Sequence, residues 1–336
     1  MRPIEIIGGG LAGLSLGLAL RRDDVPVTLH EAGDYPRHRV CGEFIAGLEA
    51  TTMARLGITG CLQDALHHDE VAWSRSGGRP VIQRLPVPAL GLSRHVLDAR
   101  LAEAFTAAGG GLHIRSRINH PETRPGRVLA TGRAAGPPRW IGLKLHAAAL
   151  DLTRDLEMHL GAHGYVGLAR IAEGVNICGL FRVRALQGRG AGLLLAYLRA
   201  AGLGTLADRV AAASIDPASV CAVAGLSFKR QPLVPGSVCL GDASAMIPPF
   251  TGNGMAMAFQ SAEVALDPLR AYARGEMEWS DTCRAIHRAV HDRFRLRLTS
   301  ARALHSFVLS PWRQRWFTAL SRARVLPFRS IYAALH

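Results

Sequence analysis

The chain has 336 residues, and its 49% hydrophobic and 20% charged residues are typical of a folded protein with a large core, which excludes a disordered chain. The 40 basic and 26 acidic residues leave a net charge of +14, which attracts nucleic acid, anionic lipid or acidic carrier-bound substrates. No nucleic-acid-reading motif accompanies that charge, so we expect no nucleic-acid partner. The six cysteines form no CxxC pair, which argues against a metal site and a disulfide framework and indicates a cytoplasmic protein.

The first 31 residues predict a strand, a glycine turn, a helix over 11–22 and a second strand at 25–30. Gly8, Gly10 and Gly13 have the GxGxxG spacing, which allows a tight turn, a close approach of a pyrophosphate and close packing of helix on strand. Leu11 and Ala12 open the helix, whose free N–H groups attract phosphate. Residues 4–20 are apolar enough to imitate a signal peptide, but no small-residue cleavage site follows them.

Glu31 follows the second strand at the distance where an acid accepts hydrogen bonds from the adenosine ribose. An acid at this point repels a 2′-phosphate, so NADP is disfavoured in this first nucleotide site. The pattern predicts a dinucleotide cofactor.

The hydrophobic pattern changes in the middle of the chain. Strands at 71–85, a helix at 94–108 and strands at 112–114 and 127–132 come first. From 139 to 226, alternating apolar and polar residues predict an antiparallel sheet with one buried face. Residues 140–146 are expected to be one of its strands, and Tyr165 is a candidate for its pocket side, although a core position is the commoner outcome.

A second glycine-bearing segment begins at residue 238. Asp242 follows Gly241 at the end of a strand, where its carboxylate could accept hydrogen bonds from a ribityl chain. A helix is expected to start near residue 253 and to direct its N-terminus at a flavin ring. The cofactor contacts expected here are Gly241, Asp242, Pro249, Gly252, Asn253, Gly254 and Met255.

The C-terminal region is helical and basic, with thirteen arginines and four acids between residues 270 and 329. A basic amphipathic helix followed by Trp312 and Trp316 suits a membrane surface, whereas an ordinary packed helix with a solvated rim explains the same pattern. We keep both interpretations, so the protein is expected to be cytoplasmic with peripheral membrane contact as the alternative.

These motifs together resemble the flavoproteins of the para-hydroxybenzoate-hydroxylase fold, and most closely the geranylgeranyl-reductase branch. The matching segments occur in the family's order: GGGLAG at 8–13, Glu31, YPRHRVCGE at 35–43, Ser93-Arg94, Ala130-Thr131-Gly132 and Gly241-Asp242 with PPFTGNGM at 248–255. The resemblance implies FAD as the cofactor, with Arg39 and Arg94 among its contacts. Thr131 and Gly132 are included as cofactor contacts on the same ground.

The fold class expected is α/β (α+β overall), with a Rossmann-like FAD-binding domain, an interleaved antiparallel-sheet substrate domain and a helical C-terminus. The FAD-binding domain is assigned to residues 1–70, 90–138 and 227–275, and the substrate domain to 71–89 and 139–226. Residues 276–336 form the basic helical region. The resemblance further implies that the sheet of the second domain covers the substrate pocket.

Three candidate catalytic residues lie in the segment at 35–43. By resemblance Cys41 passes beside the flavin, where it could shield the reactive face or act as an acid, or simply pack as a small residue. Glu43 and His38 are candidates for a proton relay, each also explained as a structural residue.

The resulting hypothesis is an FAD-dependent monooxygenase with NAD(P)H as electron donor. It would hydroxylate a small apolar or aromatic molecule, either bound to a carrier or free in solution. The first alternative is reduction of a carbon–carbon double bond, as in geranylgeranyl reductases. Flavin halogenases share the fold but use a lysine soon after the first nucleotide unit, and this chain has only Lys144 and Lys229. An alternative of another class is a non-catalytic protein that binds a membrane or a partner.

Overall fold

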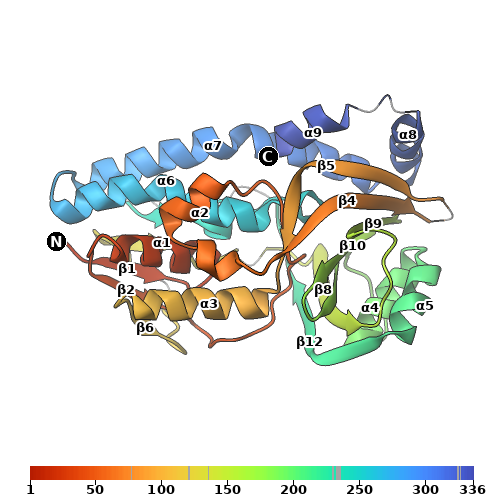
Figure 1. Ribbon diagram of the computed structural model, residues 1–336, viewed down its shortest axis with the longest axis horizontal. Helices are drawn as coiled ribbons and strands as arrows, with labels where there is room; N and C mark the ends of the chain where they lie inside the picture. The colour runs from red at the N-terminus through yellow and green to blue at the C-terminus, as the bar shows by residue number, and fades with distance from the viewer. Residues whose placement is uncertain are drawn as a thin grey trace.

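The computed structural model describes residues 1–76, 78–119, 122–134, 136–228, 231, 236–323, 325 and 327–336. Two sheets lie side by side, and a long helix, α7 (Trp279–Val308), runs along the top of the molecule from the first toward the second (Figure 1). We call the two sheets A and B. Lys229, the second of the two lysines, lies outside the described residues.

Sheet A has five strands in the order β13-β7-β1-β2-β6, and all of its pairs are parallel. The strands are β1 (Ile4–Ile7), β2 (Val27–His30), β6 (Gly111–His113), β7 (Arg127–Leu129) and β13 (Val238–Cys239). The chain proceeds from β1 to β2 on one side, while β7 and β13 lie on the other. In a parallel sheet this reversal of direction leaves a crevice at the carboxyl ends of the strands, where ligands bind.

The helices that cover sheet A bury an apolar core. They are α1 (Leu11–Arg21), α2 (Ala50–Leu56), α3 (Arg94–Ala107) and α6 (Gly254–Arg274), with short 3₁₀ turns at Thr59–Leu62, Gly241–Ala243 and Pro249–Thr251. Residues 11–20 are all buried, because α1 contacts both α3 and α6. The apolar run that imitates a signal peptide is therefore a core strand and a core helix.

Sheet B has eight strands in the order β12-β8-β11-β10-β9-β4-β5-β3. They are β3 (Phe44–Ile45), β4 (Leu66–Arg75), β5 (Val81–Gly91), β8 (Trp140–Ala148), β9 (Leu156–Gly161), β10 (Gly164–Ile171), β11 (Gly174–Arg182) and β12 (Ser214–Ala224). Neighbouring strands are antiparallel except β4 and β9, which are parallel. The short strand β3 follows directly on Cys41-Gly42-Glu43 and so connects the loop at 35–43 to this sheet. We call this loop the cofactor loop.

The expectation that this sheet has one buried face is wrong. Residues 142–147 of β8 are all buried, so both faces of the strand are covered. Helices α4 (Ala191–Ala200) and α5 (Gly204–Ala212) pack on one face, and a second apolar cluster with Tyr165 and Phe250 lies on the other. The alternation of apolar and polar residues predicts which face of the strand each side chain is on. It does not predict whether other elements cover that face.

The chain ends in two further helices, α8 (Pro311–Arg322) and α9 (Phe328–Leu335). Figure 1 shows α8 at the end of the molecule away from sheet A, and α8 contacts β5. Within the described residues, no helix has the length and apolar content needed to cross a bilayer.

Candidate functional site

One cavity of about 890 Å³ joins the two glycine-bearing segments, since Gly10 and Gly254 both line it. It begins at the carboxyl edge of sheet A and continues to the face of sheet B, where Met158, Tyr165 and Leu180 line it. This volume lies near the upper end for small-molecule sites. The two segments, more than 200 residues apart in the sequence, thus share one binding space.

A side chain at each of the three glycines of the first turn would have a different effect. Gly8 has a φ of +112°, and a Cβ there would lie 2.2 Å from the carbonyl oxygen of Ala130. A Cβ at Gly13 would lie 2.0 Å from the carbonyl oxygen of Gly8, so this glycine permits the close packing of α1 on β1. A Cβ at Gly10, by contrast, would meet no atom within 4 Å and would project into open space. Gly10 therefore leaves room in the cavity rather than in the core.

Glu31, directly after β2, lines the cavity but is only 4% exposed. One carboxylate oxygen accepts a hydrogen bond from the Gly9 amide at 2.8 Å, and the other accepts from the Gly33 amide at 2.8 Å and from Arg37 at 2.7 Å. The side chain thus holds the glycine turn in place. A ribose would share these oxygens with the protein donors.

The two arginines expected at the cofactor share one buried acid. Asp98, fully buried, accepts from Arg39 Nε at 2.8 Å and from Arg94 Nε and Nη2 at 2.7 and 2.9 Å. Both arginines line the cavity. Burial lowers the pKa of Arg39, and its Nη2 is a buried donor without a hydrogen-bond partner in the described structure. Arg39 Nη2 also lies 3.8 Å from a carboxylate oxygen of Glu31, an ion pair too long for a hydrogen bond, so this donor remains available to a ligand in the cavity.

The second glycine-bearing segment supplies the opposite wall of the cavity. Asp242 lines it, and no hydrogen bond to its carboxylate occurs within the described residues. Burial raises the pKa of Asp242 to about 6. Leu11, Ala12, Thr131, Gly132, Gly241, Pro249, Gly252 and Met255 line the cavity as well.

Two of the expected cofactor residues are not among those that line the cavity. Gly13 faces the core, as described above. The Asn253 side chain is fully buried and donates through Nδ2 to the carbonyl oxygen of Leu335 at 2.6 Å. It therefore ties the last helix to the start of α6, and only neighbouring Gly254 opens on the cavity.

These features fit FAD on three independent grounds. A Cβ at Gly10, Gly132 or Gly254 would meet no atom within 4 Å, so the backbone is accessible along the groove. The buried Arg39 Nη2 lacks an acceptor, which a pyrophosphate would provide. The Asp242 carboxylate lacks a donor, which ribityl hydroxyls would provide.

Cys41 lines the cavity between the two ends. Its Sγ lies 3.3 Å from Met255 Sδ, and its carbonyl oxygen accepts from Asn176 at 3.0 Å. Burial raises the pKa of the thiol, so the group is a protonated thiol rather than a nucleophilic thiolate at neutral pH.

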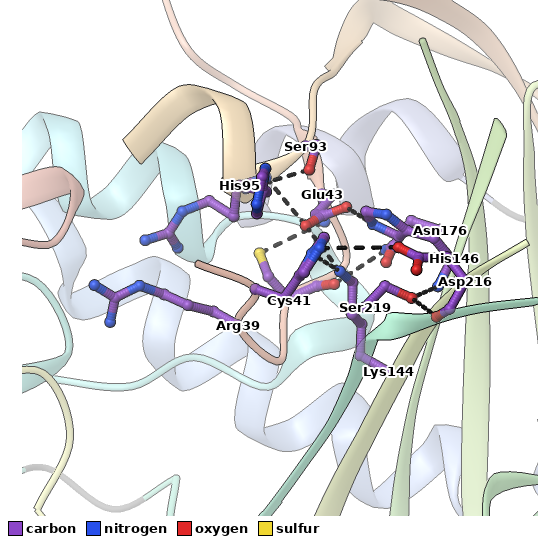
Figure 2. Close-up of polar contacts among 12 residues, drawn as sticks. Arg39, Cys41, Glu43, Ser93, His95, Lys144, His146, Asn176, Asp216 and Ser219 are labelled. Atoms are coloured by element: carbon purple, nitrogen blue, oxygen red, sulfur yellow. Dashed lines mark hydrogen bonds and ion pairs between the residues drawn. The ribbon is translucent and has the colours of Figure 1, made fainter. Parts of the chain in front are cut away.

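Glu43 belongs to a buried polar group that we call the junction cluster: Glu43, Lys144, His146 and His38. Figure 2 shows Glu43 between Lys144 and His146, the latter two from strand β8. Its carboxylate accepts from His146 Nε2 at 2.6 Å and lies 3.4 Å from Lys144 Nζ. The same carboxylate accepts from the backbone amide of Arg94 at 3.0 Å. Glu43 thus fastens the cofactor loop to sheet B and to the start of α3.

The backbone of Glu43 has a φ of +55°, a left-handed conformation that is uncommon for residues other than glycine. Such strain persists where the surroundings over-determine it. Here the buried Lys144 and His146 provide that constraint, since the side-chain exposures of Glu43 and Lys144 are both 0%.

His38 connects the junction cluster to the cavity, because it lines the cavity and lies 3.1 Å from Lys144 through Nδ1. Burial, then the charge of Lys144, lowers the pKa of His38 to about 4. An ammonium group only donates, so Nδ1 accepts and Nε2 carries the proton. His38, His146 and Asp216 lie close enough to hold a metal ion, but this proton on Nε2 disfavours coordination by His38.

Sequence analysis did not identify Lys144, His146 or Asn176 as site residues. They lie on strands β8 and β11, whose pattern signals only sheet. The rarity of lysine in this arginine-rich chain is the one signal that could have drawn attention to Lys144.

Comparisons with known proteins establish the fold. No protein-family model matches the chain, and no curated protein matches it in sequence. PqsL of Pseudomonas aeruginosa, described as a probable FAD-dependent monooxygenase, matches with a TM-score of 0.71 and 16% identity over 94% of this chain and 98% of that one. The flavin-dependent brominase Bmp2 matches with a TM-score of 0.74 and 16% identity over 98% and 92%.

A third solved structure extends the same likeness. A geranylgeranyl bacteriochlorophyll reductase-like protein of Thermoplasma acidophilum matches with a TM-score of 0.65 and 16% identity, over 91% of this chain and 87% of that one. The chain therefore has the fold of FAD-dependent oxidoreductases, as the sequence motifs predicted. The fold alone does not separate oxygenation, halogenation and reduction.

Proposed function

We propose that this protein is an FAD-dependent monooxygenase that hydroxylates a small apolar or aromatic molecule. One observation carries the proposal: a single cavity runs from the glycine loops of sheet A to an apolar wall on sheet B. A cofactor at the first end and a substrate at the second would share one enclosed space. The PqsL structure solved with 2-aminobenzoylacetate, an aromatic compound, supports the substrate class.

The roles of the residues follow from their positions. We assign the pyrophosphate to the backbone at Gly10 and to Arg39, and the ribityl chain to Asp242. Glu31 would hold the ribose and Arg94 the side of the cofactor next to Cys41. Bound FAD supplies the redox chemistry, with electrons from NAD(P)H and oxygen as the acceptor.

The protein residues near the reaction bind, orient and exclude water. Met158, Tyr165, Leu180 and Leu226 provide an apolar surface for the substrate. Tyr165 is held in place because its hydroxyl accepts from the amide of Phe250 at 3.3 Å. Glu43 is assigned a positioning role, since its carboxylate holds Lys144 and His146 rather than facing the cavity.

Halogenation is disfavoured by the position of the lysines. None of the described residues that line the cavity is a lysine, and Lys144 lies buried in the junction cluster. Reduction of a carbon–carbon double bond is the second candidate, because the protonated thiol of Cys41 faces the cavity and could deliver a proton to carbon.

We also propose a cytoplasmic location for the protein. The test of the reaction begins with purified protein reconstituted with FAD. We expect flavin absorbance, NAD(P)H oxidation that aromatic substrates accelerate, and one atom of labelled O₂ in the product. A product that gains two hydrogens without oxygen uptake would instead establish the reductase, and Cys41→Ala should then slow the reaction. Protein that shows no flavin absorbance after incubation with excess FAD and removal of the free cofactor would overturn both enzyme proposals. It would favour the non-catalytic alternative.

A further inference from the structure

Helix α8 is folded with its polar face inward. Gln314, Thr318 and Ser321 are 4%, 2% and 4% exposed, and they recur at the spacing of one helical face. On the opposite face, Trp312, Trp316 and Leu320 are 60%, 59% and 40% exposed. A helix that packs on a soluble protein normally shows the reverse arrangement. An apolar surface of this kind marks an interaction site.

Specific hydrogen bonds fix this orientation. Gln314 Nε2 donates to the carbonyl oxygens of Val308 at 2.7 Å and Gly161 at 3.1 Å. The buried Thr318 hydroxyl donates within the helix to the carbonyl oxygen of Gln314 at 3.0 Å, so this polar group is satisfied although it faces the protein. On the flank, Phe317 packs edge-on against Trp73 of β4, with ring centroids 5.5 Å apart. Rolling the helix to hide its tryptophans would break the Gln314 hydrogen bonds and the Phe317–Trp73 contact, so the exposure of the tryptophans is built into the fold.

The charge around this face has one sign. Arg313, Arg315 and Arg322 lie between the two faces of α8, with arginines on both flanks of the apolar stripe. The helix has no acidic residue, and residues 293–336 as a whole contain nine arginines and no acid. A second copy of the same face would bring arginines opposite arginines, which opposes dimerisation through α8.

We propose that α8 docks on an anionic lipid surface, with Trp312, Trp316 and Leu320 in the headgroup region. Tryptophan favours the interface because its ring is apolar and its N–H is polar. Arginines beside an apolar stripe reach phosphate groups while the stripe enters the boundary with the acyl chains. This inference concerns binding, and it holds whether or not the proposed reaction is correct.

Docking would bring the lipid surface near the apolar end of the cavity. Val308 and Leu309, which directly precede α8, pack against the cluster that includes Tyr165, a residue that lines the cavity. If the proposed function is also correct, apolar substrates dissolved in the bilayer would reach the enzyme at this end.

The experiment is co-sedimentation of the full FAD-loaded protein with vesicles, at physiological salt. Phosphatidylcholine vesicles with and without phosphatidylglycerol are the probes. We expect binding to the anionic vesicles and at least about tenfold weaker binding for Trp312→Ser/Trp316→Ser. Arg313→Ser/Arg315→Ser should weaken binding to the anionic vesicles, by about as much. Ile114→Ser, which removes an apolar side chain 48% exposed directly after β6, is the matched control and should bind normally.

Each other outcome overturns the proposal. Absence of binding to anionic vesicles would do so directly. Binding that survives the double tryptophan substitution would assign the attraction to net charge elsewhere on the protein. Self-association in sedimentation equilibrium that the same substitution abolishes would make the α8 face a contact between copies. Unchanged flavin absorbance and thermal unfolding of the variants will show that they are folded.

Discussion

The cofactor end of the cavity and the junction cluster are built by different means. The first consists of backbone loops at the carboxyl ends of β1, β7 and β13, with glycines where a side chain would block the groove. The second consists of side chains from a loop and a strand that are about 100 residues apart. Space for a ligand is thus encoded locally, whereas the attachment of the loop at 35–43 to sheet B depends on residues distant in the sequence.

The largest expected effect concerns the junction cluster. Lys144→Met leaves the Glu43 carboxylate buried without its cation, and we expect the free energy of unfolding to fall by about 3–5 kcal/mol. Chemical denaturation measures it. Arg284→Met, which removes an exposed partner of Asp281, is the control and should cost less than about 1 kcal/mol.

A second substitution sharpens the interpretation of this loss. Glu43→Gln in the Lys144→Met background removes the uncompensated charge, so part of the stability should return. A loss below about 1 kcal/mol for Lys144→Met would mean that the junction cluster does not stabilise the attachment of Glu43 to sheet B.

For a substitution at the cofactor end of the cavity, we predict weaker FAD binding without a loss of fold. Gly10→Val places a side chain in the open groove, so FAD affinity should fall at least about 100-fold, or about 2.8 kcal/mol. Fluorescence titration with FAD measures it, and thermal unfolding of the apoprotein should barely change. Gly60→Val is the matched control, because a Cβ at Gly60 also meets nothing but lies outside the cavity.

Gly8→Val separates the two functions of the same turn. A side chain there meets the backbone of Ala130 and requires a φ of +112°, so we expect a lower free energy of unfolding as well as weaker FAD binding. Equal stability of the Gly8 and Gly10 variants would contradict the assignment of one glycine to the core and the other to the ligand.

Charge at the cofactor end should have a smaller effect. Arg39→Met removes a guanidinium whose Nη2 has no hydrogen-bond acceptor among the described residues, and we expect about tenfold weaker FAD binding, or about 1.4 kcal/mol. The salt dependence of binding should also decrease. Unchanged affinity would show that the pyrophosphate does not reach Arg39.

The smallest effect concerns pH. His305 lies among the rings of Trp140, Tyr165, Phe228 and Phe250, and burial lowers its pKa to about 4 from 6.5. The unfolded chain therefore takes up the proton first, and stability that is present above pH 6.5 is lost as the pH falls toward 4.

His305→Phe should remove this dependence while filling the same space. We expect the loss of unfolding free energy between pH 7 and pH 5 to shrink by about 2 kcal/mol. Denaturation at the two pH values measures it, and an unchanged difference would mean that the imidazole is hydrated.

The same comparison explains what could be predicted from the sequence. The strand–turn–helix unit, Glu31 and the second glycine segment are local patterns, and they indicated the fold and the position of the cavity. Lys144, His146 and Asn176 meet the cofactor loop only because β8 and β11 are neighbours in sheet B, and strand alternation does not encode that pairing. Nor did alternation show that both faces of the sheet are covered.

A crystal structure of the protein grown with FAD tests the central claim most directly. We predict density for the pyrophosphate against the backbone at Gly10 and beside Arg39, and for the flavin ring beside Gly254 and Cys41. FAD bound outside the cavity, or a cavity that stays empty at saturating FAD, would contradict the account.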